Sequence, residues 1–175
     1  MFRYALLVGL GVVLFICLGA CASDDSDARV EEILRIGEES KSVLADLDLL
    51  YVAPVAAAGL TLTHSCQFID PGNLPPECRE FVSTLVRVNP ALIDAIARID
   101  SIDRSLPPDA PPELRMRIAD LASVWVLMSR SDQMIIDGWM RQNFATWGDG
   151  WDLRRDATRA LLDWAEGAGP TEGPR

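Results

Sequence analysis

The chain has 175 residues and a single histidine, His64, which is the first candidate for acid–base chemistry. A histidine that acts as a general base needs a nucleophile, an orienting acid and oxyanion donors. Ser65 is adjacent, but the chain has no Gly-x-Ser-x-Gly elbow to present a serine for attack. His64 also follows a predicted helical region, where it can bond free carbonyl groups. We interpret it as a helix-end contact, and no catalytic residue is predicted.

The most distinctive local motif is Trp147-Gly148-Asp149-Gly150-Trp151. Two glycines around an acid predict a turn of the chain. The flanking indoles could form a stacking platform for a sugar ring or a peptide, with Asp149 as the acceptor. The candidate ligand contacts are therefore Trp147, Asp149 and Trp151. The alternative, which the residue types favour, is that both indoles pack inward, because tryptophans of a helical bundle lie mostly in its core.

Asp132 stands in an otherwise apolar stripe of the longest helical pattern. It could break the helix, line a pocket, or make a buried contact with an arginine such as Arg98 or Arg130. Asp46 and Asp48 precede an apolar run, and we interpret them as part of a solvated face. Acid–base hydrolysis of a glycan needs two carboxylates at a defined separation, and no spacing selects such a pair. The sequence therefore predicts that the protein is not an enzyme.

The first residues of the chain form a leader with a short cationic start and an uncharged apolar run over residues 4–18. The run is short for a membrane span, which needs about 20 apolar residues, but it fits a secretory leader. It ends in Leu18-Gly19-Ala20-Cys21, which resembles the lipobox of bacterial lipoproteins. The resemblance covers the leader alone. It implies cleavage before Cys21, acylation of the Cys21 thiol and attachment to a membrane of the cell envelope.

In Gram-negative bacteria an aspartate directly after the lipidated cysteine resembles an inner-membrane retention signal. Here Ala22 follows Cys21, and the first acid is Asp24. The resemblance therefore implies the outer membrane, facing the periplasm, if the host is Gram-negative.

Two of the four cysteines are accounted for by the same resemblance, because Cys17 leaves with the leader and Cys21 takes the lipid. The remaining pair, Cys66 and Cys78, is expected to form a disulfide in an exported domain. Closing this loop should contribute about 3 kcal/mol of stability. The alternative is a metal site that also uses His64, but it lacks a fourth ligand. No metal or other cofactor is predicted.

Charge excludes one class of partner. Loss of residues 1–20 removes one arginine and no acid, which leaves 15 basic against 26 acidic residues and a net charge of −11. Such a surface repels nucleic acid and anionic head groups. The sequence therefore predicts no nucleic-acid binding, and contact with a membrane through the lipid.

Apolar residues recur at three- and four-residue spacings, and strand-like alternation is absent. The pattern predicts an all-α fold, a single bundle of about five helices with one disulfide-closed loop. Proline followed by glutamate predicts helix starts at residues 76 and 112. Asn89-Pro90 should end one helix and begin the next. The helix from residue 112 should reach about residue 144 or break near residues 129–132, and Asp152 could cap the last helix.

Two other segments carry structural predictions. Residues 49–62 have no polar face, which predicts a kinked and fully buried helix. Its small residues would let a neighbouring helix approach closely. The alternative is a second membrane-inserted segment. Asp70-Pro71-Gly72-Asn73 has the composition of a type II turn.

These observations divide the chain into four parts. They are a lipoprotein signal peptide (1–20), an acidic tether (21–27), a helical domain (28–166) and a disordered tail (167–175). The leading function is non-enzymatic: a lipid-anchored envelope protein that binds a protein or an envelope component through a helical surface. The alternative is binding of a small apolar or glycan ligand in a pocket near Trp147 and Trp151. Hydrolysis of envelope glycan is a third possibility.

Overall fold

The protein is described by a computed structural model that covers residues 26–58 and 66–166. Within those ranges every regular element is helical, which confirms the all-α fold. The predicted signal peptide, Cys21, His64 and the tail at 167–175 lie outside the described residues. No helix of the described ranges is long and apolar enough to span a bilayer.

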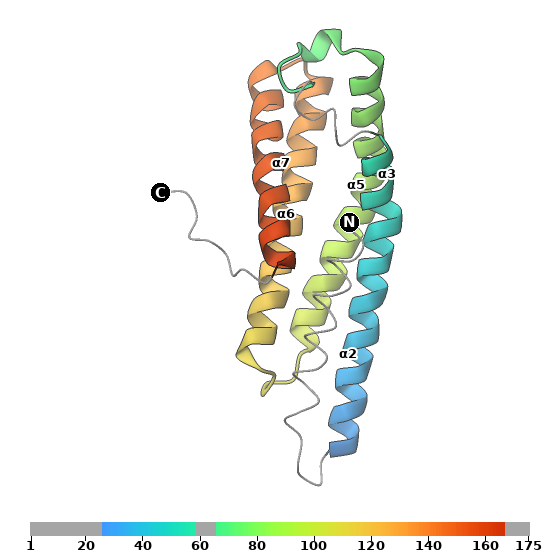
Figure 1. Cartoon of the computed structure of the whole chain (residues 1–175), viewed down its shortest axis with the longest axis vertical. Coiled ribbons are helices and arrows are strands. Elements are labelled where there is room, and N and C mark those ends of the chain that lie inside the picture. Colours follow the sequence, from blue (N-terminus) through green and yellow to red (C-terminus); the bar gives the residue numbers. More distant parts are fainter. Residues whose placement is uncertain (1–25, 59–65, 167–175) are drawn as a thin grey trace.

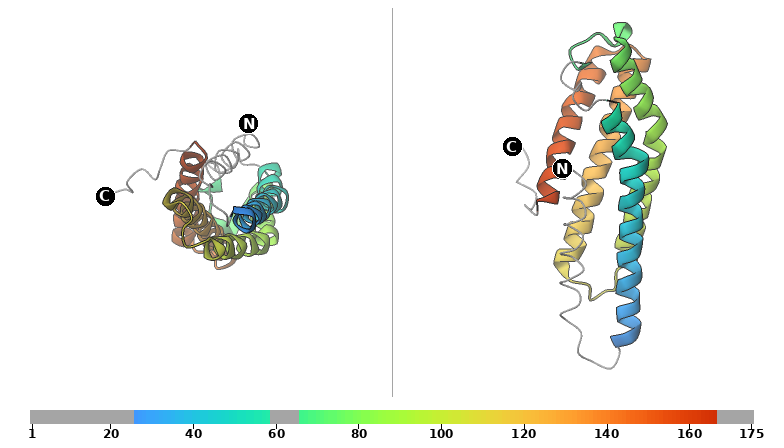
Figure 2. Two further views of the ribbon diagram at one scale, coloured as in Figure 1. Left: turned by 90° about the horizontal axis from the view of Figure 1, so that it is seen from below. Right: turned by 45° about the vertical axis from the view of Figure 1, so that its right-hand side comes forward.

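The described helices form four rods. The rods run side by side with alternating direction (Figure 1). The first rod consists of α2 (Ser26–Leu47), a π-helical turn η1 (Asp48–Val52) and the short α3 (Ala53–Ala57). A loop with one 3₁₀ turn, η3 (Pro71–Asn73), leads to α5 (Pro76–Ser105), α6 (Pro112–Met140) and α7 (Phe144–Ala165). Seen end-on, the rods follow one another around an arc in chain order (Figure 2). Each rod therefore packs mainly on its neighbour in sequence.

The five described α-helices form four rods, and α5 continues through Asn89-Pro90 as one of them. The predicted helix end at this proline is wrong. Buried residues before the proline, such as Leu85, and after it, such as Leu92, belong to one core. Pro90 itself is exposed, so the Val86 carbonyl that loses its helical partner lies on the solvent side of the helix. Burial on both sides thus outweighs a proline cost of about 3 kcal/mol.

The described part of the apolar segment, residues 49–58, is buried on one face only, so its predicted full burial is wrong; residues 59–62 lie outside the described ranges. Leu49 and Leu50 are 67% and 49% exposed, whereas Tyr51 and Val55 are buried. Ala56 and Ala57 are also exposed, so no described helix packs closely against them as predicted.

The π turn at Asp48–Val52 has two local causes. Buried residues step by four at Leu47, Tyr51 and Val55, and in an ideal α-helix each such step overshoots a full turn by about 40°. Pro54 also conflicts sterically with the carbonyl four residues before it. A wider turn eases both conflicts and keeps Tyr51 facing the core.

The turn between the last two helices lies earlier than predicted. The helix α6 runs unbroken to Met140, and α7 begins at Phe144, so Trp147–Trp151 is helical and Asp152 is not a cap. The chain reverses at Gln142, whose φ is 53°. The amide of Asn143 donates to the Gly138 carbonyl at 2.8 Å, and the Asn143 side chain accepts from the Thr146 amide at 3.2 Å. These bonds end one helix and cap the next.

Gly138 of α6 and Gly150 of α7 allow close packing of the two helices. A Cβ on Gly138 would lie 2.6 Å from the Trp147 nitrogen, and a Cβ on Gly150 would lie 2.8 Å from the Ile135 nitrogen. Both distances are far inside van der Waals contact. The α6 and α7 backbones therefore touch because these positions have no side chain.

The predicted disulfide between Cys66 and Cys78 is confirmed, with its Cα atoms 5.8 Å apart. It fastens the loop before α5 to the first turn of that helix. The predicted type II turn at Asp70 is wrong, because the residues form the 3₁₀ turn η3. The Asp70 carboxylate accepts the Gly72 amide at 2.9 Å, and this bond favours the tighter conformation.

Candidate functional site

The bundle encloses three polar side chains that bond one another: Tyr51 of the π turn, Asp132 of α6 and Arg154 of α7. Their exposed fractions are 2%, 0% and 4%. The Tyr51 hydroxyl donates to Asp132 Oδ2 at 2.5 Å. A guanidinium nitrogen of Arg154 bonds Asp132 Oδ1 and lies 3.3 Å from the Tyr51 oxygen. We call these three residues the buried triad.

Aromatic rings form part of the walls of the buried triad. The Arg154 guanidinium lies 5.4 Å from the Phe81 ring centre, where the negative face of the ring attracts a cation. The Trp125 ring meets Tyr51 edge to face at 6.0 Å. The low polarity of this environment strengthens the hydrogen bonds between the three groups.

Burial also controls the protonation of the triad. It raises the pKa of the Tyr51 hydroxyl, which therefore remains a donor. It raises the pKa of the Asp132 carboxyl as well, against the opposing effects of Arg154 and of the bond from Tyr51. Burial lowers the pKa of Arg154, but the charge of Asp132 and the bonds to both partners reverse this, and the net direction is upward. Arg154 is therefore a permanent cation.

The triad fastens three helical segments together. Asp132 makes the buried arginine contact that was one of its three predicted roles, but its partner is Arg154. Of the two arginines proposed for it, Arg98 instead bonds Asp46 of α2 at 2.6 Å, so Asp46 is not simply solvated. The triad is closed to solvent, and a substrate has no access to it in this conformation.

The residues of the tryptophan motif separate into core and surface. Trp147 and Trp151 are 0% and 3% exposed, and only Asp149 faces solvent. The Trp147 indole donates to the Cys66 carbonyl at 3.1 Å, and Trp151 stacks on Phe81 at 5.3 Å. The exposed stacking platform is therefore not formed, and the inward-packing alternative holds.

Arg154 was absent from the sequence-based candidates. It follows buried Trp147 and Trp151 and precedes buried Ala157 and Leu161 at helical spacings. Arg154 is a cation in the apolar stripe of α7, and Asp132 is an anion in the apolar stripe of α6. Two opposite charges in two apolar stripes could have suggested that these residues pair. Reading that signal required a helix through Gly148 and Gly150, where the sequence predicted a turn.

Three exposed apolar side chains belong to segments at the disulfide-bonded end of the bundle. Phe68, Met140 and Phe144 are 75%, 71% and 53% exposed. The loop that carries Phe68 lies against the α6–α7 hairpin, since Gln67 bonds Asp152 at 2.8 Å. Both segments lie at the end of the bundle opposite the start of α2 (Figure 1). We call Phe68, Met140 and Phe144 the apolar tip.

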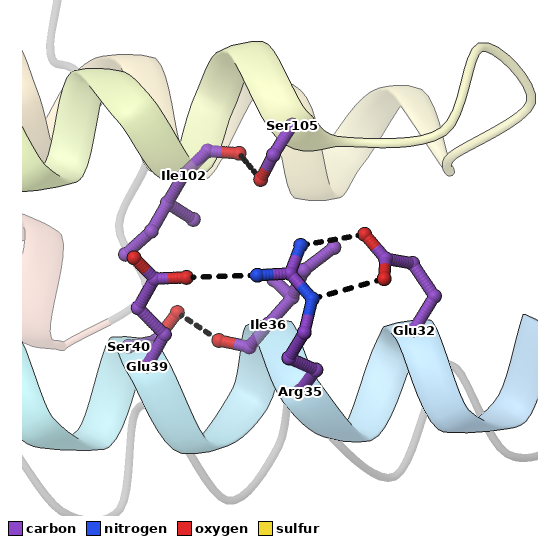
Figure 3. A network of polar contacts seen from close by, with 7 residues as sticks. All are labelled: Glu32, Arg35, Ile36, Glu39, Ser40, Ile102 and Ser105. Carbon is purple, nitrogen blue, oxygen red and sulfur yellow. Dashed lines mark hydrogen bonds and ion pairs between the residues drawn. The ribbon is translucent and has the colours of Figure 1, made fainter.

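The α2 end of the bundle is different in character. Near the start of α2, Arg35 pairs with Glu32 at 2.6 Å and with Glu39 at 3.4 Å (Figure 3). In the same region the Ser40 and Ser105 hydroxyls bond backbone carbonyls of their own helices. This end of the bundle carries exposed ion pairs along α2, and its exposed large apolar side chains are Leu34 and Met116.

Within the described ranges no group of three or more metal-ligating side chains comes together. Comparison of the chain with known protein families, curated proteins and solved structures finds no match.

Proposed function

We propose that this chain is a lipid-anchored, non-enzymatic protein of the cell envelope that binds a protein partner through the apolar tip. The observation that carries the proposal is the exposure of Phe68, Met140 and Phe144 at one end of the bundle. Exposed apolar groups of this size, gathered in one region, are typical of protein contacts. Aromatic residues and methionine are also enriched at such contacts.

Three further features support the address and the partner class. The Leu18-Gly19-Ala20-Cys21 sequence supports lipid attachment. The Cys66–Cys78 disulfide supports an oxidising compartment outside the cytosol. The formal net charge of −10 argues against nucleic acid as the partner. In a Gram-negative host, the proposed site is the outer membrane, facing the periplasm.

The anchor is tested by feeding labelled palmitate to cells that express the full chain. We expect label in the wild type and none in Cys21→Ala, because the thiol is the proposed acceptor. Equal labelling of the two chains would remove the anchor from the proposal and leave the apolar tip untouched.

The tip is tested with a photoreactive amino acid placed at Phe68 of the full chain in its native membranes. Leu49 is the matched control, because it is 67% exposed against 75% for Phe68 and lies on a different element. We expect one discrete protein adduct from position 68, lost when Met140 and Phe144 are both changed to serine, and none from position 49. The same adducts from both positions would show that the tip has no preferred partner.

A further inference from the structure

The outer face of α5 carries an apolar stripe that packs on no described helix. Val86, Pro90, Ile93 and Ala97 are all exposed, with Val86 at 45% and Ile93 at 54%. Their spacings of four, three and four residues place them within about 60° of one another around the helix. A narrow stripe of this kind is the usual seam between two packed helices.

Charged residues flank this stripe in a specific order. Arg87 and Asp94 are exposed on the same edge of the helix, and within the described part of the chain neither side chain makes a hydrogen bond or an ion pair. Further out lie Arg79, also exposed, and Asp100, which pairs with Arg104 at 2.6 Å.

The stripe and its charges are complementary to a second copy of themselves. Val86 and Ile93 lie at nearly equal distances on opposite sides of Pro90, and so do Arg87 and Asp94. The same relation holds for Ser83 and Ala97, whereas Asp100 lies at the same distance from Pro90 as the exposed Glu80 and close to that of Arg79. A two-fold axis at Pro90, perpendicular to the helix, would therefore bring Arg87 of each copy opposite Asp94 of the other and the apolar residues opposite one another. In a symmetric contact of this type both subunits use the same surface.

We propose that two copies of this protein pair through α5, antiparallel and centred on Pro90. The formal net charge of −10 opposes association of two copies in general. Near the centre of the stripe this repulsion is reduced, because Arg87 of each copy faces Asp94 of the other. Pro90 at the axis offers a compact, rigid apolar contact. A single helix face is small for an interface, so the association should be weak and reversible.

The arrangement has a geometric consequence. In an antiparallel pair the two Ser26 ends lie at opposite ends of the dimer, and the apolar tip of each copy lies beside the Ser26 end of the other. If both copies are lipid-anchored, both tethers reach one bilayer only when the rods lie along it. The pairing itself does not rest on the proposed anchor.

The first experiment uses the full chain with Pro90→Cys in native membranes, oxidised and separated without reductant. Because residue 90 meets itself at the axis, we expect a band of twice the chain's mass that disappears on reduction. The matched control is Ala45→Cys, which is also exposed on a helix but lies on α2. Equal dimer from the two variants, or an adduct with a different protein in place of the dimer, would overturn the proposal.

The second experiment reverses charges in the Pro90→Cys background. Arg87→Glu alone and Asp94→Arg alone should each lower the cross-linked fraction about tenfold, because each places like charges together twice in the dimer. Asp94→Arg lowers the net negative charge, so a general repulsion would change in the opposite direction. When the two variants are co-expressed with different tags, each contact again joins unlike charges, and mixed dimers should recover the wild-type fraction. A mixture that pairs no better than either variant alone would refute the α5 contact.

Discussion

The α6–α7 hairpin and the first helical rod are held to the bundle in different ways. In the hairpin the two backbones touch at Gly138 and Gly150. The first rod packs on α5 through side chains, and its pair of Asp46 with Arg98 is one-third to nearly one-half exposed. The Tyr51 hydroxyl also connects the first rod to α6 and α7, through its bonds to Asp132 and Arg154. Backbone contact between helices needs glycine at fixed positions, whereas side-chain contact tolerates an irregular turn.

The largest difference is expected between two aspartates that each pair with an arginine. Asp132→Ala should lower the free energy of unfolding by about 3–5 kcal/mol, because it leaves the Arg154 charge buried without a partner. Asp46→Ala is the matched control and should cost less than about 1 kcal/mol, because its pair with Arg98 is partly exposed to solvent. Urea unfolding followed by circular dichroism measures both values.

A double variant tests the cause of that loss. Asp132→Leu with Arg154→Met removes both charges, and it should cost less than Asp132→Ala alone. If the double variant is the less stable one, the pair itself contributes net stability, and the burial of an unpaired charge does not explain the effect.

Gly148 and Gly150, two residues apart and on nearly opposite faces of α7, should respond with opposite signs. Gly150→Ala should destabilise the protein by about 1–3 kcal/mol, since its methyl group would meet the α6 backbone at Ile135. Gly148→Ala meets no atom within 4 Å, and it should stabilise by about 0.5–1 kcal/mol through the better helix propensity of alanine. Thermal unfolding of the two variants measures this. A similar loss in both would argue against backbone contact in the hairpin.

The link between the two regions is tested by Tyr51→Phe. The ring that packs on Trp125 remains, but Asp132 Oδ2 loses its donor. We expect a loss of about 1–2 kcal/mol in the free energy of unfolding, the cost of a buried acceptor left without its bond. Leu49→Ala, at an exposed site of the same π turn, should change stability by less than about 0.5 kcal/mol. An equal loss in both would show that the hydroxyl contributes nothing.

The smallest expected effect is a pH dependence. Burial raises the pKa of the Asp132 carboxyl in the folded protein above its ordinary value. The folded state therefore binds this proton more readily than the unfolded state, and the resulting stability is lost as the pH rises through the folded pKa. Relative to Asp132→Asn, the wild type should gain stability as the pH is lowered from neutral toward about 4. A relative loss over this range would mean that Arg154 and Tyr51 outweigh burial.

Some features followed from the sequence because their causes are local or pairwise. Pro76 and Pro112 begin helices because proline fixes the backbone angle that a first helical turn needs. Apolar periodicity predicted the all-α class, and the two cysteines left after the leader predicted the disulfide. The apolar stripe around Asp132 predicted that this residue breaks the helix, lines a pocket or makes a buried contact with an arginine, and the third role is the one observed.

Other features were decided by contacts between distant parts of the chain. Asn89-Pro90 has the local chemistry of a helix boundary, and only burial on both sides of it keeps α5 continuous. Gly148 and Gly150 have the chemistry of a turn, yet α6 packs closely on α7 at Gly150 and keeps both within the helix. The partner of Asp132 is 22 residues away in sequence and its donor Tyr51 is 81 residues away. Local chemistry thus determined where helices can start and which residues prefer the core, but partner choice depended on how the helices pack, because each pairing requires side chains from separate rods to meet in one dry space.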